Sequence, residues 1–109
     1  MRTNVVVNLQ YEALHYWKEA ASFEKEVSFL EHPHRHLFYI TCKKAVNHDD
    51  RDVEIILLKR TVIGYLKHAY GGNFGGKSCE MVARELLERF DFEYCLVLED
   101  GENGAEVWK

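Results

Sequence analysis

The sequence predicts a single α+β domain, spanning residues 1–109, in which an antiparallel four-stranded sheet carries two helices on one face. Two observations predict this class. Two segments near the N-terminus alternate apolar and polar residues, and two later segments repeat apolar residues at helical spacing. A period of two is typical of half-buried strands and a period near 3.6 is typical of helices. With a closing hairpin at the C-terminus, the expected element order is ββααββ.

Two strands are expected in the first half of the chain. Residues 5–15 carry apolar side chains at their odd-numbered positions, and His15 continues that face. Residues 34–45 carry apolar side chains at their even-numbered positions, and His34 and His36 begin that face. The mixed segment 16–30 is interpreted as the connection between them.

Two helices and a hairpin are expected in the second half. The polar stretch 45–52 breaks the chain, and helical spacing then runs over 53–68 until the glycine-rich segment 71–76 ends it. Ser78 is a favourable N-cap for a second helix that extends to Phe90. Residues 94–98 and 105–108 are predicted strands joined by the turn DGENG.

Composition excludes several classes of function. The net charge of −4 has mixed signs along the chain, which argues against a nucleic-acid partner. No apolar run approaches the length of a membrane span, and the N-terminus has no signal-peptide core. Three cysteines without a paired spacing are typical of free thiols in a reducing compartment. We therefore expect a cytoplasmic protein without a membrane partner.

The histidines supply the candidate metal ligands. Alternate residues of a strand lie on one face about 6.6 Å apart, so His34 and His36 can share one ion. His32, in the same HPHRH run, is too far along the strand to join them, and a third ligand should come from the neighbouring strand. His15 occupies that place. Three histidines with an open fourth position are typical of catalytic zinc; a solvated, histidine-rich turn is the alternative.

Short motifs in consistent order resemble the 6-pyruvoyl- and 6-carboxy-tetrahydropterin synthase family. YEALH (11–15) resembles the family's F-x-A-x-H, and HRHLFYITC (34–42) resembles its HGHNY strand. VEIILLK (53–59) is similar to its V-D-F-x-x-L-K, and YLKHAYGGNF (65–74) to its LDH-x-x-LN segment. SCEMVARELL (78–87) resembles its PT-x-E-N-x-A helix start, and LVLEDGENGAEVW (96–108) its final hairpin.

The resemblance implies a T-fold that pairs sheet edges between subunits, as a trimer or hexamer with sites between chains. It implies Zn²⁺ bound by three histidines and a reduced pterin as the substrate. Carried over by position, the resemblance assigns zinc binding, substrate binding and proton transfer to these residues: His15, His34 and His36 as zinc ligands; Glu99, Ser78 and Glu80 at the substrate; His68 in proton transfer.

The chain departs from the family's pattern where the family places its acid–base residues. No cysteine precedes His34, and Glu31, three residues before it, is the candidate general acid or base. Lys67 replaces the aspartate of LDH. The leading hypothesis is a zinc-dependent lyase acting on 7,8-dihydroneopterin triphosphate or a related reduced pterin. The alternative is a non-catalytic zinc-containing T-fold protein that binds a pterin, a purine-like or nucleotide ligand, or a protein partner.

A third hypothesis comes from GGNFGGKS (71–78), which fits the phosphate-binding pattern G-x-x-x-x-G-K-S. In nucleotide-binding proteins this loop follows a buried strand of a parallel sheet. Here the preceding segment has helical spacing, so a P-loop nucleotidase is disfavoured. The same glycines and Lys77 remain candidates for holding the phosphates of a substrate.

Overall fold

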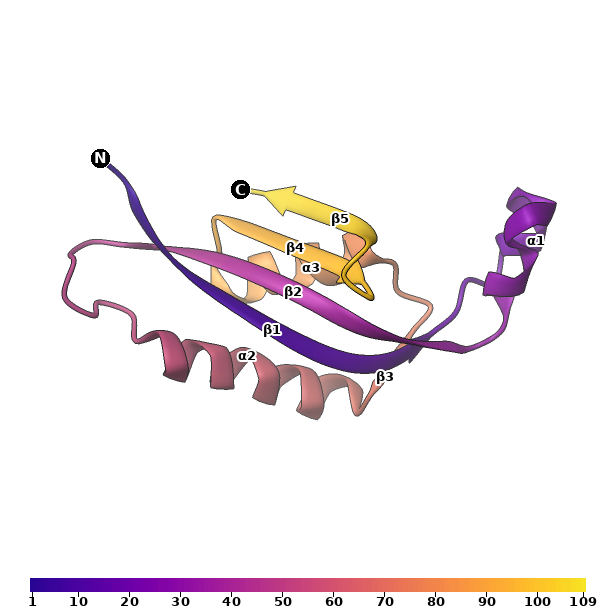
Figure 1. The fold of residues 1–109 in the computed structure, drawn as a ribbon, viewed down its shortest axis with the longest axis horizontal. Coiled ribbons are helices and arrows are strands. Elements are labelled where there is room, and N and C mark those ends of the chain that lie inside the picture. The colour runs from indigo at the N-terminus through magenta and orange to yellow at the C-terminus, as the bar shows by residue number, and fades with distance from the viewer.

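A computed structural model describes all 109 residues and shows an α+β fold (Figure 1). The elements in chain order are β1 (Thr3–His15), α1 (Ala20–Phe23), the 3₁₀ helix η1 (Lys25–Glu31), β2 (His34–Val46), α2 (Ile55–Tyr70), β3 (Asn73–Gly75), α3 (Cys79–Phe90), β4 (Tyr94–Glu99) and β5 (Asn103–Trp108). The α+β class expected from the sequence is therefore confirmed.

The sheet has five strands in the order β3-β1-β2-β4-β5. Four of them pair antiparallel as expected, but β3 runs parallel to β1 and makes the sheet mixed. This fifth strand corrects the expected four-stranded sheet, because it forms where only a glycine-rich break was expected. Three residues are too few for a period of two to be recognised. Backbone hydrogen bonds from Leu14 to Gly72 and from Tyr16 to Gly75, both 2.9 Å, hold it against β1.

The connection between β1 and β2 contains two short helices, α1 and η1. This segment projects from one end of the sheet (Figure 1). Its two phenylalanines, Phe23 and Phe29, are exposed. Helices of four and seven residues have no stable apolar stripe of their own, which explains why their sequence shows no clear period.

One hydrophobic core lies between a single face of the sheet and the helices α2 and α3. Odd-numbered residues of β1 pair with even-numbered residues of β2, as in Leu9 opposite Ile40. β2 pairs in turn with β4 through Ile40 opposite Val97. Val62 of α2 and Leu86 of α3 pack in the same fully buried cluster.

Both long helices begin at capped residues. Ser78 is the N-cap of α3, as expected, and its hydroxyl accepts a hydrogen bond of 3.2 Å from the Met81 amide. The Glu54 carboxylate caps α2 by accepting from the amides of Ile56 and Leu57. Capping satisfies amides that have no partner inside the helix, so these residues fix where the two helices begin.

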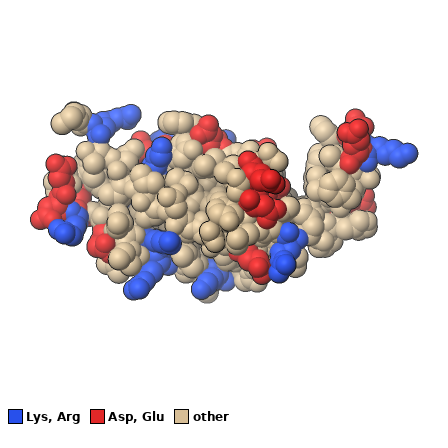
Figure 2. Space-filling model, in the orientation of Figure 1, with Lys and Arg blue, Asp and Glu red and all other residues tan.

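Surface charge is mixed. Figure 2 shows lysine, arginine, aspartate and glutamate side chains interspersed on the face in view, with no large region of one sign. No helix of the structure combines the length and the hydropathy that crossing a membrane requires.

Gly104 of β5 tests how closely the β4–β5 hairpin is packed, and Gly64 of α2 is the control. A Cβ at Gly104 would lie 1.8 Å from the Val97 carbonyl oxygen, whereas a Cβ at Gly64, in α2, would meet no atom within 4 Å. We expect Gly104→Ala to lower the free energy of unfolding by roughly 1–3 kcal/mol or more, as overpacking does. Gly64→Ala should raise it by about 0.5–1 kcal/mol, because alanine favours a helix interior. Urea unfolding of both variants measures these changes, and equal stabilities would contradict the close backbone approach.

Candidate metal centre

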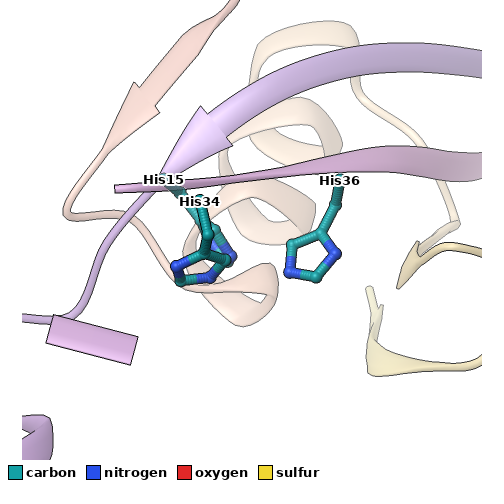
Figure 3. Close-up of side chains that lie close together, drawn as sticks. All are labelled: His15, His34 and His36. Atoms are coloured by element: carbon teal, nitrogen blue, oxygen red, sulfur yellow. The ribbon is translucent and has the colours of Figure 1, made fainter. Parts of the chain in front are cut away.

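Three histidines meet where β1 ends and β2 begins. His15, the last residue of β1, pairs with His34, the first residue of β2, and His36 lies two residues further along the same face. Their ring centroids are 4.5 Å (His15–His34), 5.2 Å (His15–His36) and 5.0 Å (His34–His36) apart. One ring nitrogen of each lies within 4.8 Å of the other two. Figure 3 shows the three rings on one side of the strand pair.

Nδ1 of each ring, which we call the outer nitrogen, faces an oxygen atom. Nδ1 of His34 lies 2.8 Å from the His32 carbonyl, and Nδ1 of His15 lies 3.3 Å from the Lys77 carbonyl. Nδ1 of His36 lies 2.7 Å from Oδ2 of Asp100. Carbonyl and carboxylate oxygens only accept hydrogen bonds, so each Nδ1 carries the proton and donates it outward. The lone pair of each neutral ring is therefore on Nε2.

The three Nε2 atoms are buried, and none has a hydrogen-bond partner. Buried polar atoms are almost always satisfied, so three orphaned atoms in one place require an explanation. Neutral imidazoles with their outer N–H groups held by oxygen atoms are typical metal ligands. The donor set fits a divalent transition-metal ion, and no other group in the structure satisfies these lone pairs.

Asp100 is a functional residue that sequence reasoning missed, because DGENG was interpreted only as a turn. One of its oxygens holds His36, and the other accepts a 3.0 Å hydrogen bond from the Leu37 amide. The Leu37 amide, and then His36, keep the pKa of the Asp100 carboxyl below its ordinary value. Its backbone lies in the left-handed region (φ 56°), where aspartate is among the better-tolerated residues. The available signal was that Asp100 begins the hairpin turn directly after the predicted strand 94–98.

Glu99 of β4 lies beside the triad. One of its oxygens is 3.1 Å from His15 Nε2 and the other is 3.7 Å from His36 Nε2. Contact with the His15 ring, aided by the charges of the neighbouring rings, lowers the pKa of Glu99 against the opposing effect of burial. Burial alone lowers the pKa of His15, but Glu99 and the Lys77 carbonyl raise it above its ordinary value in the metal-free protein.

A pocket of about 410 Å³ opens next to the triad. His15, His34 and Glu99 form its polar floor, and Trp17, Leu30 and Met81 supply apolar wall. Ser78 and Glu80, at the start of α3, also line it. This volume lies within the usual range for small-molecule sites. The candidate substrate-binding residues therefore surround one cavity.

Lys77 lines the same pocket, but its ammonium group is already occupied. It donates to Glu85 and, at 2.8 Å, to the hydroxyl of Tyr70. Hydrogen bonds to Glu85 and Tyr70 raise its pKa above the ordinary value for lysine. A phosphate group must therefore compete with Glu85 for this side chain. The P-loop hypothesis is also unsupported, since α2 precedes the glycines and β3 forms inside them.

Glu31 and His68, the candidates for proton transfer, lie outside the pocket. Glu31 is exposed at the end of η1, and His68 is exposed on α2 next to Lys67. Neither lines the cavity beside the triad. Within one chain, the ionisable groups in contact with the three histidines are Asp100, 2.7 Å from His36, and Glu99, 3.1 Å from His15.

A scan against models of protein families finds no match to this chain, and a search of curated proteins finds no significant relative. Function is therefore argued from the geometry of the site and from the order of the sequence motifs.

Replacing His15 tests the metal centre. We expect His15→Ala to abolish tight binding of zinc, used as the probe ion, in calorimetric titration. At about 100 times Kd, zinc should raise the free energy of unfolding of the natural protein by about 2.7 kcal/mol and leave that of the variant unchanged. His32→Ala is the matched control, because its backbone carbonyl still holds His34. Equal zinc binding by His15→Ala and the control would show that the triad is not the site.

Replacing Asp100 tests its role in holding His36. Asparagine has one acceptor oxygen for the two donors that Asp100 satisfies, and its NH₂ group cannot accept from Nδ1. Asp100→Asn should weaken zinc binding by roughly 10–100-fold, as expected for a partner that orients a ligand. Glu102→Gln, an exposed change in the same turn, should leave the affinity unchanged. An unaltered affinity in Asp100→Asn would mean that His36 is oriented without it.

Proposed function

We propose that this protein binds one zinc ion through His15, His34 and His36 and acts as a zinc-dependent lyase on a reduced pterin, 7,8-dihydroneopterin triphosphate or a close relative. The observation that carries the proposal is the set of three buried, unpartnered Nε2 atoms in three histidines whose ring nitrogens lie within 4.8 Å of one another. Imidazole is a common ligand of zinc, as of copper, iron and nickel. Three protein ligands are typical of catalytic zinc sites. When bound, zinc polarises an oxygen of the substrate and lowers the pKa of a hydroxyl group.

The reaction type comes from the resemblance to 6-pyruvoyl- and 6-carboxy-tetrahydropterin synthases. An antiparallel set of four strands with two helices on one face supports a T-fold, and the short parallel β3 lies outside the four-stranded sheet that the resemblance implies. The ligands occupy the positions that the motifs assign, at the end of one strand and the start of the next.

The chain's own residues account for binding of a flat, polar ring. Trp17, Leu30 and Met81 exclude water from one side of the pocket, while Ser78 and Glu80 offer polar atoms on another. A carboxylate such as Glu99 accepts hydrogen bonds from adjacent N–H groups, which is the pattern a pterin presents at its amide and amino edge. The pocket size supports a ligand of this class.

Proton transfer requires more than one chain in this proposal. Glu31 and His68 are exposed and do not line the pocket, so in this proposal they contribute to a site completed by another subunit. Beyond the short pairing with β3, β1 is an unpaired sheet edge, and so is β5 at the opposite side. Open edges of this length are usually covered. A homo-oligomer, trimer or hexamer, would cover them and place residues of neighbouring chains together.

A specific observation favours a second candidate function. Lys67 stands where the family has an aspartate beside its histidine, and both Lys67 and His68 face solvent. No thiol precedes His34. A non-catalytic zinc-containing T-fold protein would keep the metal centre and the pocket without these groups, and would bind a pterin, a purine-like or nucleotide ligand, or a protein partner.

Turnover by the zinc-loaded protein distinguishes the two functions. We expect consumption of 7,8-dihydroneopterin triphosphate, followed by chromatography with fluorescence detection, to be lost in His15→Ala and kept in His32→Ala. Lys67→Asp should raise kcat if the natural site is impaired, within the roughly 10²–10⁴-fold that acid–base catalysis supplies. Zinc and pterin binding without turnover in either form would identify the non-catalytic alternative. Native mass spectrometry of the same samples reports the oligomeric state.

A further inference from the structure

The carboxylate of Glu99 occupies an unusual position for a group that only binds substrate. Glu99 pairs with Phe38 across β2 and β4, so its side chain lies on the same face as the histidines. Its two oxygens approach two different unpartnered nitrogens, 3.1 Å from His15 Nε2 and 3.7 Å from His36 Nε2. The side chain is 31% exposed, so it stands between the buried triad and the open pocket.

The direction of this approach does not suit a hydrogen bond. A donor and acceptor should align along the N–H axis, yet His15 Nε2 has no hydrogen-bond partner although an oxygen lies 3.1 Å away. Where the ring is neutral and Nδ1 carries its proton, the Nε2 lone pair and the Glu99 carboxylate face each other as two electron-rich groups. Such an arrangement is unfavourable unless a proton on Nε2 or a metal cation lies between them, and a metal ion satisfies both groups at once.

The distances match those between two ligands of one ion. Zinc binds histidine nitrogen at about 2.0–2.1 Å and carboxylate oxygen at about 2.0–2.2 Å, so neighbouring ligand atoms of a tetrahedral ion lie about 3.4 Å apart. The two separations of 3.1 and 3.7 Å lie on either side of this value.

The geometry points to Glu99 as the fourth ligand of the metal, which closes the centre as a three-histidine, one-carboxylate site. This inference rests on the proposed zinc binding and deepens it. The charges agree, because Glu99 and the nearby Asp100 together balance a divalent cation. The Cys79 thiol donates a weak hydrogen bond of 3.9 Å to Oε2 of Glu99, the same oxygen that approaches His15.

A closed site has a consequence for substrate binding. A ligand that takes the fourth position of a tetrahedral ion displaces Glu99, and the released carboxylate then becomes available to N–H groups of that ligand. The two roles of Glu99, metal ligand and ring anchor, would thus alternate.

Cobalt(II), which reports its coordination in visible absorption, tests the inference when loaded into the natural protein, Glu99→Gln and Glu102→Gln. The natural protein and Glu102→Gln should show four-coordinate spectra that azide does not alter. Glu99→Gln should bind azide at the opened position, and its zinc affinity should fall by at least about 100-fold, the upper end of the range for an outer partner. Circular dichroism verifies that the variant is folded.

The outcomes separate the inference from the proposed function. An azide response of the natural protein equal to that of Glu99→Gln would overturn the fourth-ligand role and leave the triad intact. A sulfur-to-cobalt charge-transfer band in the near ultraviolet that Cys79→Ser removes would assign the fourth position to Cys79 instead. If the natural protein bound neither cobalt nor zinc, the proposed function itself would fail.

Discussion

The antiparallel pairing of β1 with β2 is the constraint on which the site depends. Thirteen residue pairs in unbroken register run from Thr3 opposite Val46 to His15 opposite His34. Side chains of a strand alternate between faces, so a shift of one residue would exchange the buried and exposed sets of a strand. The large apolar residues of both strands fix the register by packing in the core. The register in turn places the histidines at the far end of the strands opposite one another. The metal centre is therefore positioned by packing that lies up to a strand's length away.

Much of the fold was predictable because long elements carry a clear period. The alternation over 5–15 and 34–45 and the helical spacing over 53–68 identified the main strands and helices, and the N-cap at Ser78 fixed the start of α3. The short elements α1, η1 and β3 were not predictable, since they contain too few residues to show a period. β3 takes its hydrogen bonds from β1, which is distant in sequence, whereas α1 and η1 form local hydrogen bonds and contact each other.

The sequence predicted the common face of the three histidines, because strand register decides their positions. It did not predict the contacts that depend on tertiary structure. His15, His34 and His36 share a face by counting along two paired strands. Asp100 meets His36 through a hairpin turn, a contact that no spacing rule gives. Glu99 was expected at the pocket, but its approach to two histidine nitrogens depends on the pairing of β4 with β2. Lys77 was expected to meet phosphate, whereas its side chain joins Glu85 through packing of α3.

The hydrogen-bond acceptors of the three histidine Nδ1 atoms differ in kind. Two of them, at positions 32 and 77, are main-chain carbonyls, and only position 100 contributes a side chain. A carbonyl is supplied by any amino acid, so sequence divergence at positions 32 and 77 leaves the orientation of two rings untouched while the backbone keeps its course. The site therefore depends on side-chain identity at the three histidines, Glu99 and Asp100, and only on the course of the backbone at positions 32 and 77.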